Sequence, residues 1–337
     1  MKKLWEKKWL RTCVAIVGLA VLVVVLTAIV RAAATNYILS VINKSLIYFI
    51  AVASINLMLG FTGYLNFSTI PFMGLSAFIT ADLALAGWSI PLAMLVGTLA
   101  CGVLSYILGF SLLRLKGPYF VFGSMGLVYI GQVIYNNFVA FSGGPNGRSN
   151  FGKLELFGHR LSTFKEWFPV LLVIAFFFIW FTYRIKNTAL GRGLMATRDD
   201  ETAACTLGID VYRSKRIIYT IACLMCGFAG ALLAVHNGMV SASLFNMLTA
   251  QRFVIMAMLG GILSPIGSFF GAFIVSWLPE VMRFSSSLMN ILFGVMIILL
   301  MIFMPMGVAG IVSSLYKRTL AKIKARKEGT EDVSSGS

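Results

Sequence analysis

The sequence predicts an all-α integral membrane protein with about ten membrane-entering helices. Of its 337 residues, 59% are hydrophobic and only 12% are charged, whereas charged residues make up about 25% of a typical soluble domain. The apolar residues gather in runs of about 20, the length that a helix needs to cross a bilayer. This composition excludes a soluble enzyme and a nucleic-acid-binding protein. The net charge of +16 is interpreted as a topology signal, because cytoplasmic loops collect Lys and Arg.

The first expected span is the apolar run from Cys13 to Val30, which follows a basic segment, residues 1–12, assigned to the cytoplasm. A basic stretch before an apolar one also fits a secretory signal, with the alanines at 32–34 as a small-residue cleavage site. The run is longer than a usual signal core, so an uncleaved span is favoured. Cleavage of residues 1–34 stays open.

Eight further apolar runs are expected to enter the membrane: Tyr37–Leu59, Thr69–Gly87, Ile90–Leu113, Pro118–Phe141, Trp167–Tyr183, Ile217–His236, Arg252–Glu280 and Leu288–Met304. With the first span they form one permease domain, residues 13–305. Segment 184–216 holds seven basic residues and segment 142–166 holds four. The positive-inside rule therefore places 184–216 in the cytoplasm and 142–166 outside.

The run Arg252–Glu280 is expected to enter the membrane twice. The tail, residues 306–337, is basic and belongs in the cytoplasm, which a single crossing of this run would forbid. The middle of the run carries paired glycines and Pro265, the residues that a helix break requires. We therefore expect two short or re-entrant segments that meet near Ser264 and Pro265, with both termini cytoplasmic.

Glycines and polar residues interrupt the apolar runs near residues 60–74, 117–126 and 260–271. Broken helices place free backbone groups at the substrate path of transporters, although small residues also serve close helix packing. The candidate pathway residues from these interruptions are Asn56, Gly60, Thr62, Gly63, Asn66, Ser68, Gly260, Gly261 and Ser264. Asp82 joins them as the one acid well inside an apolar run, where charge is costly and often functional. Alternatively, Asp82 lies near the end of its span and reaches interfacial water.

Two motifs are set aside. Cys223 and Cys226 have a C-x-x-C spacing, but no second pair exists and both lie in an apolar run, so they are expected to pack rather than bind zinc. Residues 147–154 have the glycine and lysine skeleton of a phosphate-binding loop, but Leu154 replaces the hydroxyl that holds magnesium. The chain is therefore expected to bind no metal, nucleotide or other cofactor itself.

The segment after the sixth span is expected to form two short helices. Thr188 can cap a helix that runs to Ala196. A second helix, Thr197–Gly208, would carry three acids near its start, where the helix dipole favours them, and a glycine at its end. The two helices and the charged tip between them form either an ordinary solvated loop or a docking surface for a cytoplasmic partner.

Several stretches occur together and in order: Asn56–Gly63, Arg114–Tyr119, Gly143–Gly147, Gly191–Arg192, Arg198–Ala204, Leu207–Ile209 and Leu259–Gly261. Through them the chain resembles, from about Ser54 to Gly310, the M-type permease subunits of branched-chain amino acid ABC transporters. The resemblance implies an all-helical permease like those of type II ABC importers, multi-pass in the bacterial plasma (inner) membrane. It implies a second permease subunit, two cytoplasmic ATPase subunits that hold ATP and magnesium, and an extracytoplasmic solute-binding protein.

The resemblance also assigns roles to residues. The ATPase-coupling residues would be Gly191, Arg192, Arg198, Asp199, Asp200, Glu201, Ala204, Leu207 and Gly208. The binding protein would dock at Gly144, Pro145, Asn146 and Arg148. The chain would then be a transport subunit rather than an enzyme.

Alternatives stay open at this point. Leucine-like amino acids, other amino acids, urea and short amides all remain as substrates, and the partner permease is not identified. An ion-coupled secondary transporter of small polar solutes would need carboxylates inside the membrane, for which Asp82 is the one candidate. A membrane-embedded enzyme would have to use the acids at 199–201, whose side chains point in different directions around a helix.

Overall fold

The computed structural model describes residues 35–156, 159–281 and 294–295. Its helices are α2 (Asn36–Thr62), α3 (Thr69–Leu85), α4 (Ile90–Leu112), α5 (Pro118–Asn137), α6 (Val139–Ser142), α7 (Phe164–Lys186), α8 (Ala189–Asp199), α9 (Glu201–Thr206), α10 (Val211–Asn237), α11 (Met247–Gly260) and α12 (Pro265–Val281). Short 3₁₀ turns are η1 (Gly144–Asn146) and η2 (Ala242–Leu244). The expected segments 1–12, 13–30 and 306–337, and all of 288–304 except 294–295, lie outside the described residues.

The described residues form an all-α membrane fold. Six of their helices are long and apolar enough to cross a bilayer: Asn36–Thr62, Ile90–Leu112, Pro118–Asn137, Phe164–Lys186, Val211–Asn237 and Ala242–Gly260. The apolar helices Thr69–Leu85 and Pro265–Leu278 are shorter. Each expected run between residues 37 and 280 is therefore helical, whereas the total of ten segments extends beyond the part of the chain that the structure describes.

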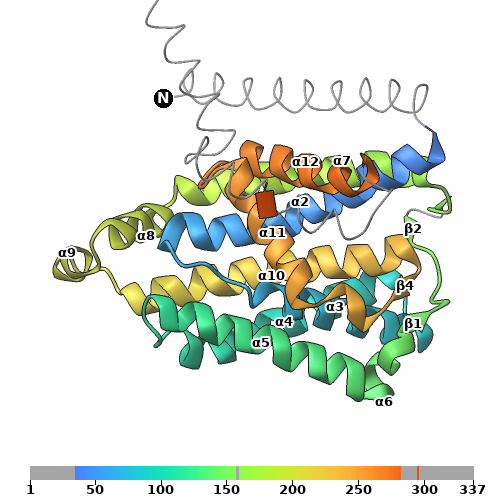
Figure 1. Cartoon of the computed structure of the whole chain (residues 1–337), viewed down its shortest axis with the longest axis horizontal. Helices are drawn as coiled ribbons and strands as arrows, with labels where there is room; N and C mark the ends of the chain where they lie inside the picture. Colours follow the sequence, from blue (N-terminus) through green and yellow to red (C-terminus); the bar gives the residue numbers. More distant parts are fainter. Residues whose placement is uncertain (1–34, 157–158, 282–293, 296–337) are drawn as a thin grey trace, which may run out of the picture.

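α2 and α10 form the centre of the bundle, and most of their side chains are buried. α3 and α4 pack against α10, while α7 and α12 pack against α2 (Figure 1). α4 and α5 lie on the outside and direct apolar side chains away from the core, such as Leu99, Val103, Phe122 and Val133. Such a surface suits contact with lipid, because acyl chains are as apolar as these side chains.

The polar segments gather at the two ends of the bundle. At one end lie α8 and α9, and at the other lie two small antiparallel sheets (Figure 1). In the first sheet β1 (Arg148–Ser149) pairs with β4 (Met239–Val240), and in the second β2 (Glu155–Leu156) pairs with β3 (His159–Arg160). We call residues 188–208 the knob. The end of the bundle that carries α8 and α9 is the knob end, and the end that carries the two small sheets is the sheet end.

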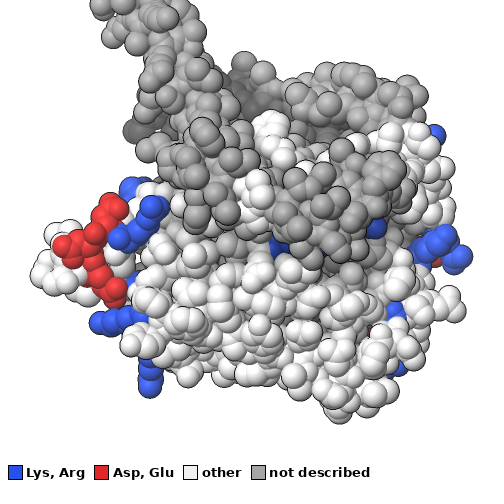
Figure 2. All heavy atoms as spheres, viewed as in Figure 1, with Lys and Arg blue, Asp and Glu red and all other residues white. Residues whose placement is uncertain are grey.

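Segment 114–116, which carries Arg114 and Lys116, lies at the same end of the bundle as segment 184–216, which the basic residues assign to the cytoplasm (Figure 1). The Tyr212 hydroxyl donates a hydrogen bond to the Phe110 carbonyl at the end of α4. The Arg216 guanidinium lies 3.9 Å from the centre of the Phe110 ring. Charged side chains of both signs cluster over the knob, while the visible flank of the bundle carries almost none (Figure 2).

α11 and α12 form an antiparallel helical hairpin, as the paired glycines and Pro265 predict. A Cβ on Gly260 would overlap the Gly267 carbonyl, and a Cβ on Gly271 would overlap the Met256 carbonyl. The turn, residues 261–264, uses positive φ at Gly261 (102°) and at Leu263 (63°). Small residues thus let the two backbones approach, and proline opens the second helix because it cannot continue the first.

Several expected spans differ in their limits, and local features explain the difference in two of them. The run Pro118–Phe141 breaks at Phe138 into α5 and α6. The run Trp167–Tyr183 is longer, because Thr163 and Glu166 make a capping box that starts α7 at Phe164.

Candidate functional site

The knob consists of two capped helices, but their boundary differs from the expected one. The Thr188 hydroxyl accepts the Gly191 N–H at 3.2 Å, as predicted. α8 continues to Asp199, so Arg198 and Asp199 end the first helix instead of starting the second. Asp200 alone caps α9, because its extended backbone lets Oδ1 accept the N–H groups of Thr202 and Ala203.

The expected coupling residues divide into an outer and an inner set. The exposed set is Arg192, Arg198, Asp199, Asp200, Leu207 and Gly208. Leu207 is 77% exposed at the tip of the knob, an unusual place for an apolar side chain in a polar segment. Gly191 and Ala204 are buried, and a Cβ on Gly191 would overlap the Ile185 carbonyl. Gly191 and Ala204 therefore pack the knob against the bundle, while the exposed residues other than Arg198 face away from it.

Arg198 attaches the knob to the end of α2. Its Nη1 donates a 2.9 Å hydrogen bond to the Gly60 carbonyl, in the last turn of α2. Gly63 closes that helix with φ of 73° and an N–H directed at the Leu59 carbonyl. A cation suits this position, because the carbonyls of the last turn lack helical partners and carry the negative end of the dipole.

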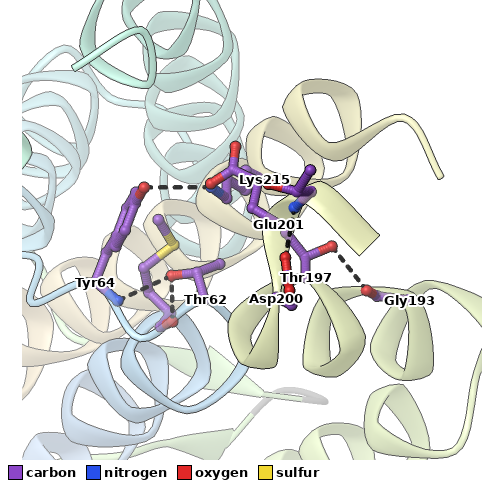
Figure 3. A network of polar contacts seen from close by, with 9 residues as sticks. Thr62, Tyr64, Gly193, Thr197, Asp200, Glu201 and Lys215 are labelled. Atoms are coloured by element: carbon purple, nitrogen blue, oxygen red, sulfur yellow. Dashed lines mark hydrogen bonds and ion pairs between the residues drawn. The ribbon is translucent and has the colours of Figure 1, made fainter. Parts of the chain in front are cut away.

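Lys215 makes a second attachment. Its Nζ lies 2.9 Å from Oε2 of Glu201 and 3.3 Å from the Tyr64 hydroxyl, and 4.6 Å from the centre of the Tyr64 ring. Figure 3 shows these three side chains converging from the knob, the segment after α2 and the start of α10. The Lys215 side chain is only 7% exposed against 42% for Glu201, so the lysine depends on this pairing more than the glutamate does.

α2 in turn contacts the α11–α12 turn through Asn56. Its Nδ2 donates to the Gly261 carbonyl at 2.9 Å and to the Ser268 hydroxyl at 2.5 Å, and its Oδ1 accepts the Leu263 N–H at 3.0 Å. A Cβ on Gly60 would lie 2.8 Å from the Leu263 side chain. Both sides of the Asn56 amide are therefore used to satisfy polar groups of a broken helix.

The remaining candidates near residue 66 line a re-entering segment. After Gly63 the chain turns back into the bundle, and Asn66 and Ser68 are fully buried. The Asn66 Oδ1 accepts the Ser68 N–H and hydroxyl, and the Ser68 Oγ lies 2.8 Å from the Tyr219 hydroxyl. Thr62 bonds its hydroxyl to the Met58 carbonyl. This re-entry explains why α3 is short.

Thr62 and Gly63 end α2, and the other expected pathway residues separate into three places. Asn56, Gly60, Gly260, Gly261 and Ser264 come together where α2 meets the α11–α12 turn. Asn66 and Ser68 lie against α10. Asp82 lies at the sheet end, where its Oδ1 is 2.8 Å from Nε of Arg148, both side chains being about one-third exposed (29% and 30%).

The ion pair between Asp82 and Arg148 bears on the alternative of an ion-coupled secondary transporter. An ion carrier needs a carboxylate that can exchange its ion within the membrane, whereas Asp82 is paired at the end of its helix. Arg148, expected at a docking surface, also donates to the Ala140 carbonyl at 2.6 Å. Gly144, Pro145 and Asn146 form η1 beside it. Among the described residues, no group of three or more His, Cys, Asp or Glu could hold a metal ion.

Sequence reasoning missed Lys215, Tyr64, Tyr219 and Ser268. Lys215 entered only as one of the basic residues of its segment. It lies four residues before Tyr219 on α10, and both are buried. Its position one turn before the apolar part of the helix is a weak signal that could have singled it out.

The bundle of long apolar helices, with polar segments at its two ends, defines a multi-pass membrane protein (Figure 1). The family described as branched-chain amino acid transport system / permease component matches residues 37–305. The chain therefore belongs to this family, whose members are transport subunits and not enzymes. The resemblance inferred from the sequence is confirmed.

Curated relatives agree. The high-affinity branched-chain amino acid transport system permease protein LivM of Salmonella typhimurium is 30% identical over 295 residues, which cover 79% of this chain and 68% of the relative. LivM of Escherichia coli is 29% identical over 293 residues, with 78% and 68% covered. The fructose import permease protein FrcC of Rhizobium meliloti is 32% identical over 193 residues, 53% of this chain and 51% of the relative. No solved structure matches.

Proposed function

We propose that this chain is the transmembrane permease subunit of an ABC importer for branched-chain, or related small, amino acids. The knob end faces the cytoplasm, where the knob seats against an ATPase subunit and transmits its movement to the membrane helices. The sheet end faces the extracytoplasmic space. Both termini are cytoplasmic, and the permease domain has the organisation of type II importers.

The observation that carries the proposal is the chain of contacts from the knob to the broken helix. Arg198 holds the knob to Gly60, and Asn56, one turn earlier on α2, holds the α11–α12 turn. A displacement of the knob therefore has a direct structural route to free backbone groups within the membrane. Transporters place such groups at the solute path.

The partners follow from this assignment. A permease subunit of this family takes its energy from partner chains, and we assign ATP and magnesium to two ATPase subunits. A second permease subunit completes the membrane domain. A solute-binding protein docks at the sheet end near Gly144, Pro145, Asn146 and Arg148.

The substrate class rests on the relatives. The two LivM proteins, named for branched-chain amino acids, match over more than two thirds of their length. The fructose permease FrcC matches over about half of its own. The longer similarity supports an amino acid over a sugar.

The exposed tip of the knob provides a test. We expect Leu207→Ser to reduce copurification of the ATPase subunit with the permease by roughly tenfold, because a buried leucine contributes about 1.5–3 kcal/mol to an interface. Pull-down from detergent-solubilised membranes, quantified against permease recovered, measures this.

The matched control is Met239→Ser, which removes a similar apolar side chain that is 51% exposed at the sheet end. It should leave copurification of the ATPase unchanged. Equal recovery of the ATPase with Leu207→Ser and with the unaltered chain would contradict docking through the knob.

A further inference from the structure

A cavity of about 360 Å³ lies in the sheet-end half of the bundle, between α2, α10, α11 and α12. Its size falls within the range of about 300–1,000 Å³ that is typical of small-molecule sites. Much of its wall is apolar, with side chains such as Leu233, Phe253, Met256 and Val275. None of the candidate pathway residues expected from the sequence lines it, so it is a separate feature of the fold.

Two cations line this cavity. Lys44 contributes from the third turn of α2, and Arg252 contributes from the second turn of α11. No Asp or Glu occurs among the described residues of the wall. The ammonium of Lys44, in a wall whose described residues include no acid, favours an anionic group over a neutral or cationic one.

Lys44 makes no ion pair or hydrogen bond with the residues that the structure describes. An unpaired ammonium within the apolar part of a membrane protein is costly and marks function. Across the same cavity, the buried hydroxyl of Ser276 on α12 also lacks a hydrogen-bond partner among the described residues. Both groups have the chemistry to bind a carboxylate, one by charge and one by hydrogen bonding.

We propose that this cavity binds the carboxylate and the aliphatic side chain of the solute, with Lys44 as the cation that selects the carboxylate. The inference rests on the proposed function for the identity of the solute. It adds a specificity: solutes with a free carboxylate are bound, whereas their amides are not. Since no acid is present on the described wall, an amino group is tolerated rather than required.

Thiol labelling tests the proposal without any ATPase. Ser243→Cys places a thiol on an exposed part of the cavity wall, in a full-length chain with Cys13→Ser and Cys205→Ser to remove other reactive thiols. The rates of modification by a negatively charged methanethiosulfonate and by its trimethylammonium counterpart are compared in membrane vesicles. Lys44→Leu should lower the ratio of anionic to cationic rate by roughly tenfold, whereas Lys44→Arg should preserve it.

Protection gives an independent readout on the chain with Lys44 intact. Leucine and 4-methylpentanoate should slow the labelling of Cys at 243, and leucinamide should not. Lys153→Leu, which removes an exposed lysine at the sheet end, is the control and should change neither result.

Three outcomes would overturn the proposal: a rate ratio unaffected by Lys44→Leu, equal protection by leucinamide and leucine, or protection by phosphatidylglycerol in place of leucine. Loss of ATPase docking would leave every one of these measurements intact, so failure of the proposed function is recognised separately.

Discussion

Arg198→Glu is expected to reduce uptake by roughly tenfold or more while the protein still inserts in the membrane. The substitution replaces a charge-assisted hydrogen bond, typically about 1.5–3 kcal/mol, by a carboxylate that the Gly60 carbonyl repels. The unfavourable placement of an anion at the end of α2 adds to this. Because Arg198 is exposed, the cost falls on the attachment of the knob rather than on the core. Uptake of radiolabelled leucine, per permease in the membrane, measures the effect.

Two further variants serve as controls for Arg198→Glu. Arg198→Lys keeps the charge but loses the planar guanidinium, and it should retain part of the uptake. Lys153→Glu makes the same reversal on an exposed residue at the sheet end and should transport normally. Full uptake with Arg198→Glu would show that the bond to Gly60 has no part in transport.

Asn56→Leu is the second substitution with a large expected effect. It leaves the Leu263 N–H and the Ser268 hydroxyl without the Asn56 partner, and a buried polar group left unpaired costs about 1–3 kcal/mol. We expect uptake per folded transporter to fall by roughly tenfold, with continued ATP hydrolysis by the assembled complex. The reason is that the α11–α12 turn would no longer move together with α2.

Asn43→Leu separates this effect from general destabilisation. Asn43 is also a fully buried asparagine of α2, and its Nδ2 donates to the Phe164 carbonyl at 2.9 Å, far from the α11–α12 turn. Both variants should lower the temperature of thermal unfolding. Only Asn56→Leu should lower the amount of uptake per ATP hydrolysed. Equal ratios of uptake to hydrolysis in the two variants would contradict the role assigned to Asn56.

Much of the fold could be predicted because apolar runs and helix breakers act locally. The runs located α2 to α5, α7 and α10, and Gly260, Gly261 and Pro265 located the α11–α12 turn. The knob was predicted as two helices, but the helix-dipole argument grouped three acids at one helix start. Only one residue can occupy a cap, and Asp200 takes it with an extended backbone. Arg198 and Asp199 therefore belong to the helix before.

The site was less predictable because its contacts join distant parts of the chain. Arg198 meets a carbonyl 138 residues earlier, and Arg148 meets the acid at position 82. A sequence shows that such charges exist but not where their partners lie. Glycines did mark breaks near residues 60–63 and 260–261, but the sequence did not show that these two breaks lie against each other. Lys44 and Lys215 carried no local signal strong enough to separate them from the basic residues that set topology.

The orientation and exposure of the knob can be measured on the native thiol of Cys205, which is exposed on α9 while Cys101, Cys223 and Cys226 are buried. With Cys13→Ser, a membrane-impermeant maleimide should label Cys205 in inside-out vesicles and not in intact spheroplasts. Bound ATPase subunits should slow the reaction. Labelling from the outer face, or a rate indifferent to the ATPase, would contradict a cytoplasmic knob that couples this permease to its partner.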